Sequence, residues 1–194
     1  NLSFRVNGSY ETAENYAFFS SLPFSSQSNR DQGFEYGNAF DVVYDDLETL
    51  SFKTSLQFDF STNLQMGFRA AFNSYSTDNL PDALNLPELT YSFNSSYNIN
   101  DQWSVSGMIF YQGERNDFTE AIDNPVDLSL VTIDDYVTID DYLDVNLHSS
   151  YQINEKLAVF IKGNNLLEGN YRRWKDYRVQ SLQILGGLRF QFDW

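Results

Sequence analysis

The densest group of potential ligand side chains lies at 114–144, where ten Asp or Glu residues accompany a single Arg. A six-residue unit that begins Thr-Ile-Asp-Asp-Tyr occurs there twice, at 132–137 and 138–143. Carboxylate oxygens are the ligands that Ca²⁺ prefers, about six to eight at a time. The spacing is not that of an EF-hand loop, and neighbouring side chains of a strand point apart, so a solvated acidic loop is the alternative. A calcium site would use Asp134, Asp135, Asp140 and Asp141.

Cations gather in a second segment, 171–178, with the sequence Tyr-Arg-Arg-Trp-Lys-Asp-Tyr-Arg. It contains four of the twelve Lys and Arg residues of the chain. Guanidinium groups bind phosphate through paired hydrogen bonds, so this segment could bind phosphate groups or a partner protein. The alternative is that its aromatic side chains only form the rim of the fold. The candidate residues are Arg172, Arg173, Trp174, Lys175 and Arg178.

Catalysis has little support in the sequence. His148 is the single histidine, cysteine is absent, and no serine stands in a nucleophile elbow. We therefore expect no enzyme and no cofactor. The net charge of −15 also argues against nucleic acid as a partner, because proteins that bind phosphate backbones carry a basic face.

The secondary-structure elements that must position these groups are recognised by a repeat of apolar residues at every second position. Aromatic residues make up 17% of the chain, yet its mean hydropathy is −0.43 and no apolar run approaches the length of a membrane helix. Apolar and polar residues alternate instead, which is the pattern of β-strands with one apolar face. The predicted strands are 2–10, 50–60, 64–72, 89–99, 102–111, 143–151, 157–162 and 182–194.

The connections between these eight strands alternate in length. Tight turns are expected at 61–63, 100–101 and 154–155, and long connections at 11–38, 76–87, 112–136 and 168–180. Outer-membrane barrels sort their loops in this way, with short turns in the periplasm and long loops outside. An even number of strands would place both chain ends on the periplasmic side.

The fold class predicted is therefore all-β, an antiparallel transmembrane β-barrel. Aromatic residues stand at strand ends, where an interfacial girdle would lie: Tyr10, Phe60, Tyr97, Trp103, Tyr111, Tyr151 and Trp194. The alternative is a soluble barrel or sandwich, in which the apolar face would point inward.

The residues that would face the interior of the barrel are mostly small and polar, with scattered charges at Arg5, Lys53, Asp59, Arg69, Asp144 and Arg189. The interior of a closed eight-stranded barrel is just wide enough to be filled by side chains. Small polar rows instead favour the wall of a wider lumen, so we expect one part of a larger barrel. A complete small barrel with a structural or adhesive role, and a passive porin, stay open as alternatives.

The last third of the chain carries a recognisable pattern. It comprises 142–151, 157–167 with Asn165-Leu166, then Tyr171, and 186–192 with alternating aromatic residues. This pattern resembles the C-terminal strands of TonB-dependent outer-membrane receptors. Segment 44–50 and Leu86-Pro87 are similar to the Bacteroidota branch of these barrels.

The resemblance implies a barrel of about 22 strands with a plug domain and a TonB box. Residues 1–194 would then be C-terminal barrel strands with no plug domain, located in the bacterial outer membrane. Such receptors import siderophores, cobalamin or glycans with energy transmitted by TonB. The implied partners are TonB, a surface lipoprotein, outer-membrane lipid, and lipopolysaccharide, whose phosphates the basic segment could bind.

The barrel-assembly machinery is a further implied partner. The stretch Gly187-x-x-Phe190-x-Phe192 is similar to the signal that this machinery reads. It departs from the signal in that Asp193 and Trp194 follow it, and in having Leu185 at a position that is usually polar.

Overall fold

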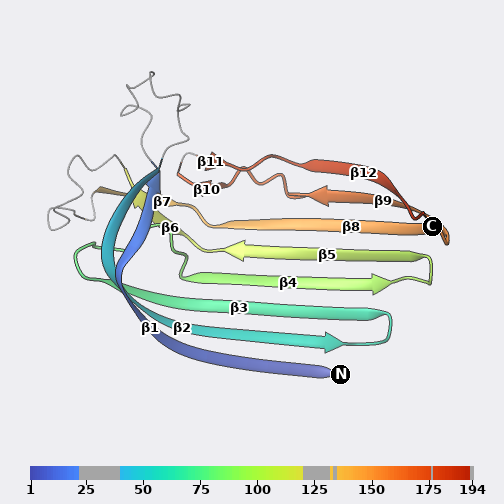
Figure 1. The fold of residues 1–194 in the computed structure, drawn as a ribbon, viewed down its shortest axis with the longest axis horizontal. Coiled ribbons are helices and arrows are strands. Elements are labelled where there is room, and N and C mark those ends of the chain that lie inside the picture. The colour runs from blue at the N-terminus through green and yellow to red at the C-terminus, as the bar shows by residue number, and fades with distance from the viewer. Residues whose placement is uncertain (22–39, 120–131, 133–134, 176, 193–194) are drawn as a thin grey trace, which may run out of the picture.

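Eight antiparallel strands form one sheet in the computed structural model, which describes residues 1–21, 40–119, 132, 135–175 and 177–192 (Figure 1). Each strand pairs with its neighbour in sequence order. The strands are β1 (Leu2–Ser21), β2 (Phe40–Asp59), β3 (Leu64–Thr77), β4 (Leu89–Asn98), β5 (Trp103–Gln112), β8 (Tyr142–Asn154), β9 (Leu157–Asn164) and β12 (Gln183–Phe190). The predicted all-β antiparallel fold is confirmed, and each of the eight predicted strands corresponds to one strand of this sheet.

The predicted long connections at 112–136 and 168–180 were wrong in part, because each contributes to a small hairpin. One hairpin consists of β6 (Arg115–Phe118) and β7 (Tyr136–Ile139), the other of β10 (Arg172–Trp174) and β11 (Tyr177–Arg178). The connection predicted at 11–38 was too long as well, since β1 runs on to Ser21 and β2 starts at Phe40. These two extensions pair with each other, which satisfies their backbone groups beyond the end of β3.

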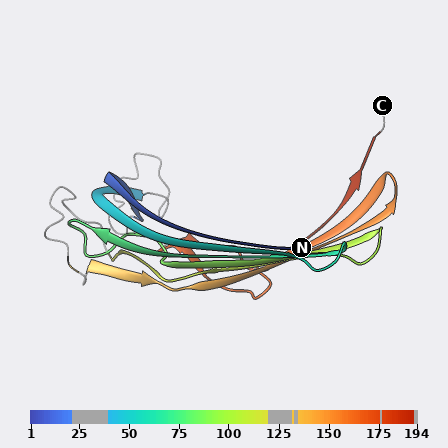
Figure 2. The ribbon, with the colours of Figure 1, turned by 90° about the horizontal axis from the view of Figure 1, so that it is seen from below.

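The sheet is an open, curved surface. Figure 2 shows it as a shallow trough, with β12 rising at one side. Strands β1 and β12 are its two edges and do not pair with each other within the described residues. A helix long and apolar enough to cross a membrane does not occur in the part of the chain that the structure describes.

The apolar face of the sheet is open to the surroundings. Leu56 of β2 is paired with Phe68 of β3, and Phe68 is paired with Phe93 of β4, so these three side chains lie on the same apolar face. Side chains on it are far more exposed than core residues, with Phe4 at 67% and Leu188 at 72%. A soluble sandwich would bury such a face against a second layer, and the described residues provide no such layer.

A bulge in β1 moves its apolar side chains to the opposite face. The register with β2 shifts between Ala13 and Tyr16, and Asn15 takes the left-handed conformation with φ of 52°. One extra residue reverses the facing of all those that follow. Phe18 therefore lies opposite Val43, on the polar side of the sheet, although the even-numbered residues before the bulge lie on the apolar side.

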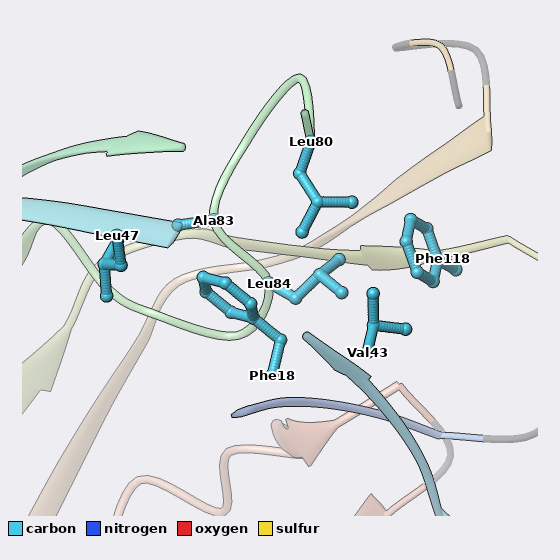
Figure 3. Packing of buried hydrophobic residues seen from close by; sticks show 7 residues of the cluster. All are labelled: Phe18, Val43, Leu47, Leu80, Ala83, Leu84 and Phe118. Atoms are coloured by element: carbon cyan, nitrogen blue, oxygen red, sulfur yellow. The ribbon is translucent and has the colours of Figure 1, made fainter. Parts of the chain in front are cut away.

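The hydrophobic core sits at the loop end of the sheet, where side chains of the distal parts of β1 and β2 pack with residues of the connections and of β6. Figure 3 shows its buried residues: Phe18, Val43, Leu47, Leu80, Ala83, Leu84 and Phe118. Tyr16, Tyr75, Leu86 and Tyr136 pack against this group. We call the region formed by the distal parts of β1 and β2, residues 78–88 and both hairpins the loop cluster.

Candidate functional site

The carboxylate of Asp45 organises the connection between β3 and β4. Its two oxygens accept hydrogen bonds from the backbone N–H groups of Asn79 (2.9 Å), Leu80 (2.8 Å) and Asp46 (3.0 Å), and from the Asn79 amide (2.8 Å). Burial acts to raise the pKa of the Asp45 carboxyl, but these donated bonds outweigh it and hold the pKa below its ordinary value. The carboxylate therefore stabilises the loop cluster in its charged form.

The loop cluster should lose stability in acid through Asp45. A carboxyl group whose pKa is depressed by folding contributes stability above its unfolded pKa, and this stability is lost as the pH falls through the folded value. We expect the hydrogen-exchange protection of the Leu80 amide to decrease once the pH is below about 4. Asp45→Asn should lower that protection at pH 7 by about 2 kcal/mol, because the new NH₂ group faces N–H donors. Asp101→Asn, at an exposed position in the turn before β5, is the control, and equal protection in both variants would contradict the assignment.

Asp117 is a second buried carboxylate of the loop cluster, with 0% exposure. The Ser20 hydroxyl donates to its Oδ1 at 2.6 Å, and the Phe118 N–H donates at 2.9 Å. Sequence reasoning counted Asp117 only as one of the acidic residues in 114–144. Its structural role could not be read there, because its partner Ser20 is 97 residues away.

Two cations tie the hairpins of the loop cluster together. The Arg115 guanidinium is buried and donates to the backbone carbonyls of Arg172 and Arg173, each at 3.0 Å. In the opposite direction, the Lys175 ammonium donates to the carbonyls of Phe118 (2.8 Å) and Thr119 (2.9 Å). Burial lowers the pKa of Arg115, while Tyr142, whose ring lies 5.7 Å away, and Asp117 act in the opposite direction.

Arg115→Lys should loosen the β10–β11 hairpin. The planar guanidinium reaches two carbonyls at once, whereas an ammonium group cannot reproduce that fork. We expect trypsin to cleave within 172–178 about tenfold faster in this variant, which corresponds to the loss of one charge-assisted hydrogen bond. Arg189→Lys, on the distant strand β12, serves as the control. Unchanged cleavage kinetics in Arg115→Lys would show that the clamp does not hold the hairpin.

The structure divides the predicted basic segment into internal and exposed residues. Arg172 donates to the Lys175 carbonyl, Lys175 binds the other hairpin, and the Trp174 ring packs 5.1 Å from that of Phe40. Arg172, Arg173 and Arg178 are exposed to solvent, whereas Trp174 and Lys175 are half-buried. Arg173 and Arg178 are best placed to meet an external phosphate, because the guanidinium of Arg172 already donates to the Lys175 carbonyl.

Three of the four predicted calcium ligands, Asp135, Asp140 and Asp141, lie in the described part of the chain, and they are not grouped there. Asp135 accepts hydrogen bonds from the N–H and hydroxyl of Thr132, which closes a local turn. Asp140 and Asp141 are exposed between β7 and β8, and Asp134 lies outside the described residues. Within 1–21, 40–119, 132, 135–175 and 177–192, no three carboxylate, histidine or cysteine side chains are grouped as a metal site requires.

A cavity of about 560 Å³ brings the two charged segments together. Its lining includes Asp140 and Asp141 from the acidic repeat, and Arg172, Lys175 and Arg178 from the basic segment. The sequence alone did not indicate this proximity. The mixed charge of the lining gives the cavity both hydrogen-bond donors and acceptors.

The rings of Tyr142 and Tyr171 form the aromatic part of that cavity, stacked with centroids 4.0 Å apart. Burial raises the pKa of Tyr171 to about 12, and the nearby Asp144 carboxylate adds to this effect. The phenol therefore stays protonated and available as a hydrogen-bond donor at neutral pH.

The Asn-Leu motif has a clear structural role. Asn165 takes the left-handed conformation, with φ of 50°, and is buried. Its side-chain amide donates to the carbonyls of Gly169 (2.9 Å) and Gln180 (3.1 Å), and its Oδ1 accepts from the Gly169 N–H (3.0 Å). The motif thus closes the connection between β9 and β12.

The remaining sequence candidates lie on the sheet itself. His148 stands in register with Ser106 and Lys162, and its ring lies 6.1 Å from that of Phe160. The predicted girdle residue Trp194 lies outside the described residues. Within the described part, Tyr10, Phe60, Tyr97, Trp103 and Tyr151 are exposed, and Tyr111 is half-buried.

A curved antiparallel sheet with an uncovered apolar face is the architecture of a portion of an outer-membrane barrel. No family model matches this sequence, and no curated protein matches it either. Solved structures do match: the ferripyoverdine receptor of the outer membrane of Pseudomonas aeruginosa aligns over 98% of this chain and 25% of its own, with a TM-score of 0.68 and 16% identity.

Two further matched structures are proteins named for other ligands. The copper transporter OprC aligns with a TM-score of 0.65 and 14% identity, over 98% of this chain and 29% of its own. The ferric-catecholate import receptor Fiu from Escherichia coli K12 aligns with a TM-score of 0.65 and 15% identity, over 98% and 25%. At these identities the likeness shows the fold: the chain has the fold of one part of an outer-membrane receptor barrel, and it spans 25–29% of the length of these three receptor chains.

Proposed function

We propose that this chain forms part of the barrel wall of a TonB-dependent-type receptor in the bacterial outer membrane, which imports a nutrient. The observation that carries the proposal is the distribution of side chains on the curved sheet. Large apolar residues such as Phe4, Phe52 and Leu188 are exposed on one face, and Ser, Asn, Gln and charged residues occupy the other. Lipid would cover the first face and the lumen would hydrate the second.

The open edges support a larger barrel rather than a closed one of eight strands. Within hydrocarbon, an unpaired strand edge costs several kcal/mol for each orphan backbone group. A complete small barrel would have to pair β1 with β12, and these two strands are opposite edges of the described sheet. We therefore propose that other strands of the same receptor pair with both edges, and that residues 1–194 are its C-terminal strands rather than any part of a plug.

The proposed partners follow from this assignment. TonB and a surface lipoprotein would act with the complete receptor, and the barrel-assembly machinery would insert it through 187–192. Arg173 and Arg178, exposed at the loop end, would bind the phosphates of lipopolysaccharide. The similarity of 44–50 and Leu86-Pro87 supports a receptor of the Bacteroidota type.

The mass of the native protein tests the proposal. We expect antibodies against this segment to detect a protein in the outer-membrane fraction that resists extraction with alkaline carbonate. Its mass should be roughly four times 22.5 kDa, because the chain covers about 25% of the receptors it matches. A membrane protein of 22.5 kDa would instead support the small structural barrel. A monomer that stays dispersed in buffer without detergent would overturn the membrane assignment.

A further inference from the structure

Three cations lie close together on the polar face of β1, β2 and β3. The register places Arg5 opposite Ser55, and Ser55 opposite Arg69, so that the two arginines flank one serine across three adjacent strands. Adjacent strands are about 4.8 Å apart, which puts the two arginine backbones roughly 10 Å from each other. Lys53 lies two residues along β2 from Ser55 and therefore on the same face.

Two adjoining cavities on this face share the same charged lining. One is about 290 Å³ and the other about 410 Å³, and both are lined by Arg5, Ser55 and Arg69. Lys53 joins the lining of the larger one. Neither cavity has an Asp or Glu in its lining, although the chain contains 27 acidic and only 12 basic residues.

Like charges repel each other, and the repulsion is strongest where few counter-charges are near. An arrangement of three cations without a lining carboxylate is stabilised when an anion enters. Guanidinium groups present paired N–H donors that match the oxygens of phosphate and carboxylate groups. The Asn7 amide and the Ser55 and Ser92 hydroxyls line the larger cavity and can donate further hydrogen bonds.

We propose that Arg5, Lys53 and Arg69 form a binding site for a small, multiply charged oxyanion, such as phosphate or a solute with several carboxylates. Arg5 and Arg69 bind the oxyanion from two sides above Ser55, and Lys53 adds a third charge. The inference rests on the proposed function in one respect, that the polar face lines a hydrated lumen. The volumes of the two cavities fit a small solute better than a folded segment.

Isothermal titration of the full-length detergent-solubilised protein with inorganic phosphate tests the site. We expect saturable binding that weakens as sodium chloride is raised. Arg5→Gln and Arg69→Gln should each weaken phosphate binding about tenfold or more, through the loss of a charge-assisted hydrogen bond. Arg189→Gln removes one positive charge from β12, outside both cavity linings, and should leave the affinity unchanged.

Three outcomes would overturn the oxyanion site. These are no phosphate binding by the native protein, equal weakening by Arg189→Gln, and full affinity in the Arg5→Gln/Arg69→Gln double variant. A polypeptide segment that already covers the face with its carboxylates would give the first of these results. Failure of the proposed function would be recognised separately, because the protein would then stay dispersed and monomeric in buffer without detergent. The titration itself measures phosphate binding and does not depend on transport.

Discussion

Phe18→Ala should lower the stability of the loop cluster by about 3–5 kcal/mol. The Phe18 side chain is 1% exposed and packs in the group of apolar residues that includes Val43, Leu84 and Phe118. Its removal leaves a cavity among side chains from four separate segments, which cannot all move to fill it. We expect the amides of Leu80, 82–84 and 115–118 to lose hydrogen-exchange protection, while those of the main sheet keep theirs.

Phe19→Ala provides the matched control. Phe19 is the next residue along β1, and its side chain is 48% exposed on the opposite face. This variant should change the protection of the loop cluster by less than about 1 kcal/mol. If both alanine variants had the same effect, the bulge at Asn15 would not direct Phe18 into the core, and the arrangement of the loop cluster would be wrong.

Leu56→Arg should destabilise the folded protein in lipid bilayers by about 2–4 kcal/mol. Leu56 lies in the middle of the apolar face, opposite Phe4 on one side and Phe68 on the other. A guanidinium at that position would have to leave water for the hydrocarbon of the membrane. Urea titration of the protein in phospholipid vesicles, followed by tryptophan fluorescence, measures the change.

Gln57→Arg introduces the same side chain one residue further along β2, on the polar face. We expect it to change the stability by less than about 1 kcal/mol, since the guanidinium can remain hydrated in the lumen and water screens its repulsion from Arg5 and Arg69, which line the same cavity. A larger effect of Gln57→Arg than of Leu56→Arg would mean that the polar face is the one in contact with lipid. That result would reverse the orientation on which the proposed function depends.

These two experiments concern two differently stabilised parts of the molecule. In the proposed function, the sheet lies in the membrane with its apolar side chains outside, and lipid takes the place of a core. The loop cluster projects beyond that sheet and has a buried core of its own, together with the buried carboxylates of Asp45 and Asp117. Variants of the loop cluster should therefore change loop order without preventing assembly of the strands.

The sequence predicted the strands well wherever alternation was uninterrupted. From Leu64 to Phe72, each apolar residue is followed by a polar or small one, and the structure has β3 there. Prediction failed for the distal part of β1, because the bulge at Asn15 breaks the period of two. The hairpins were missed for a related reason, since strands of two to four residues are too short for a period to be recognised.

The candidate site was harder to predict than the fold. Arg172 and Lys175 were recognised as cations, but their backbone acceptors could not be assigned from sequence. Arg115 was counted only as the single Arg of 114–144, and Asp45 appeared only within the segment 44–50. Neither could be given a structural role, because a charge in a strand looks the same whether it faces water or a ring of buried hydrogen-bonding groups. Asn165 had been singled out through the resemblance, as part of the Asn-Leu motif, but its hydrogen bonds could not be assigned from sequence either.

The amino-acid sequence by itself determined the fold class, the eight strands and, where alternation is uninterrupted, the apolar face of the strand, because side chains alternate along an extended chain regardless of their neighbours. Only the tertiary structure decided where the core lies, which cations are internal, and that Arg5, Lys53 and Arg69 lie together on one face. The physical reason is that these properties depend on register between strands and on contacts between distant segments, such as Ser20 with Asp117, and local patterns do not encode such distances.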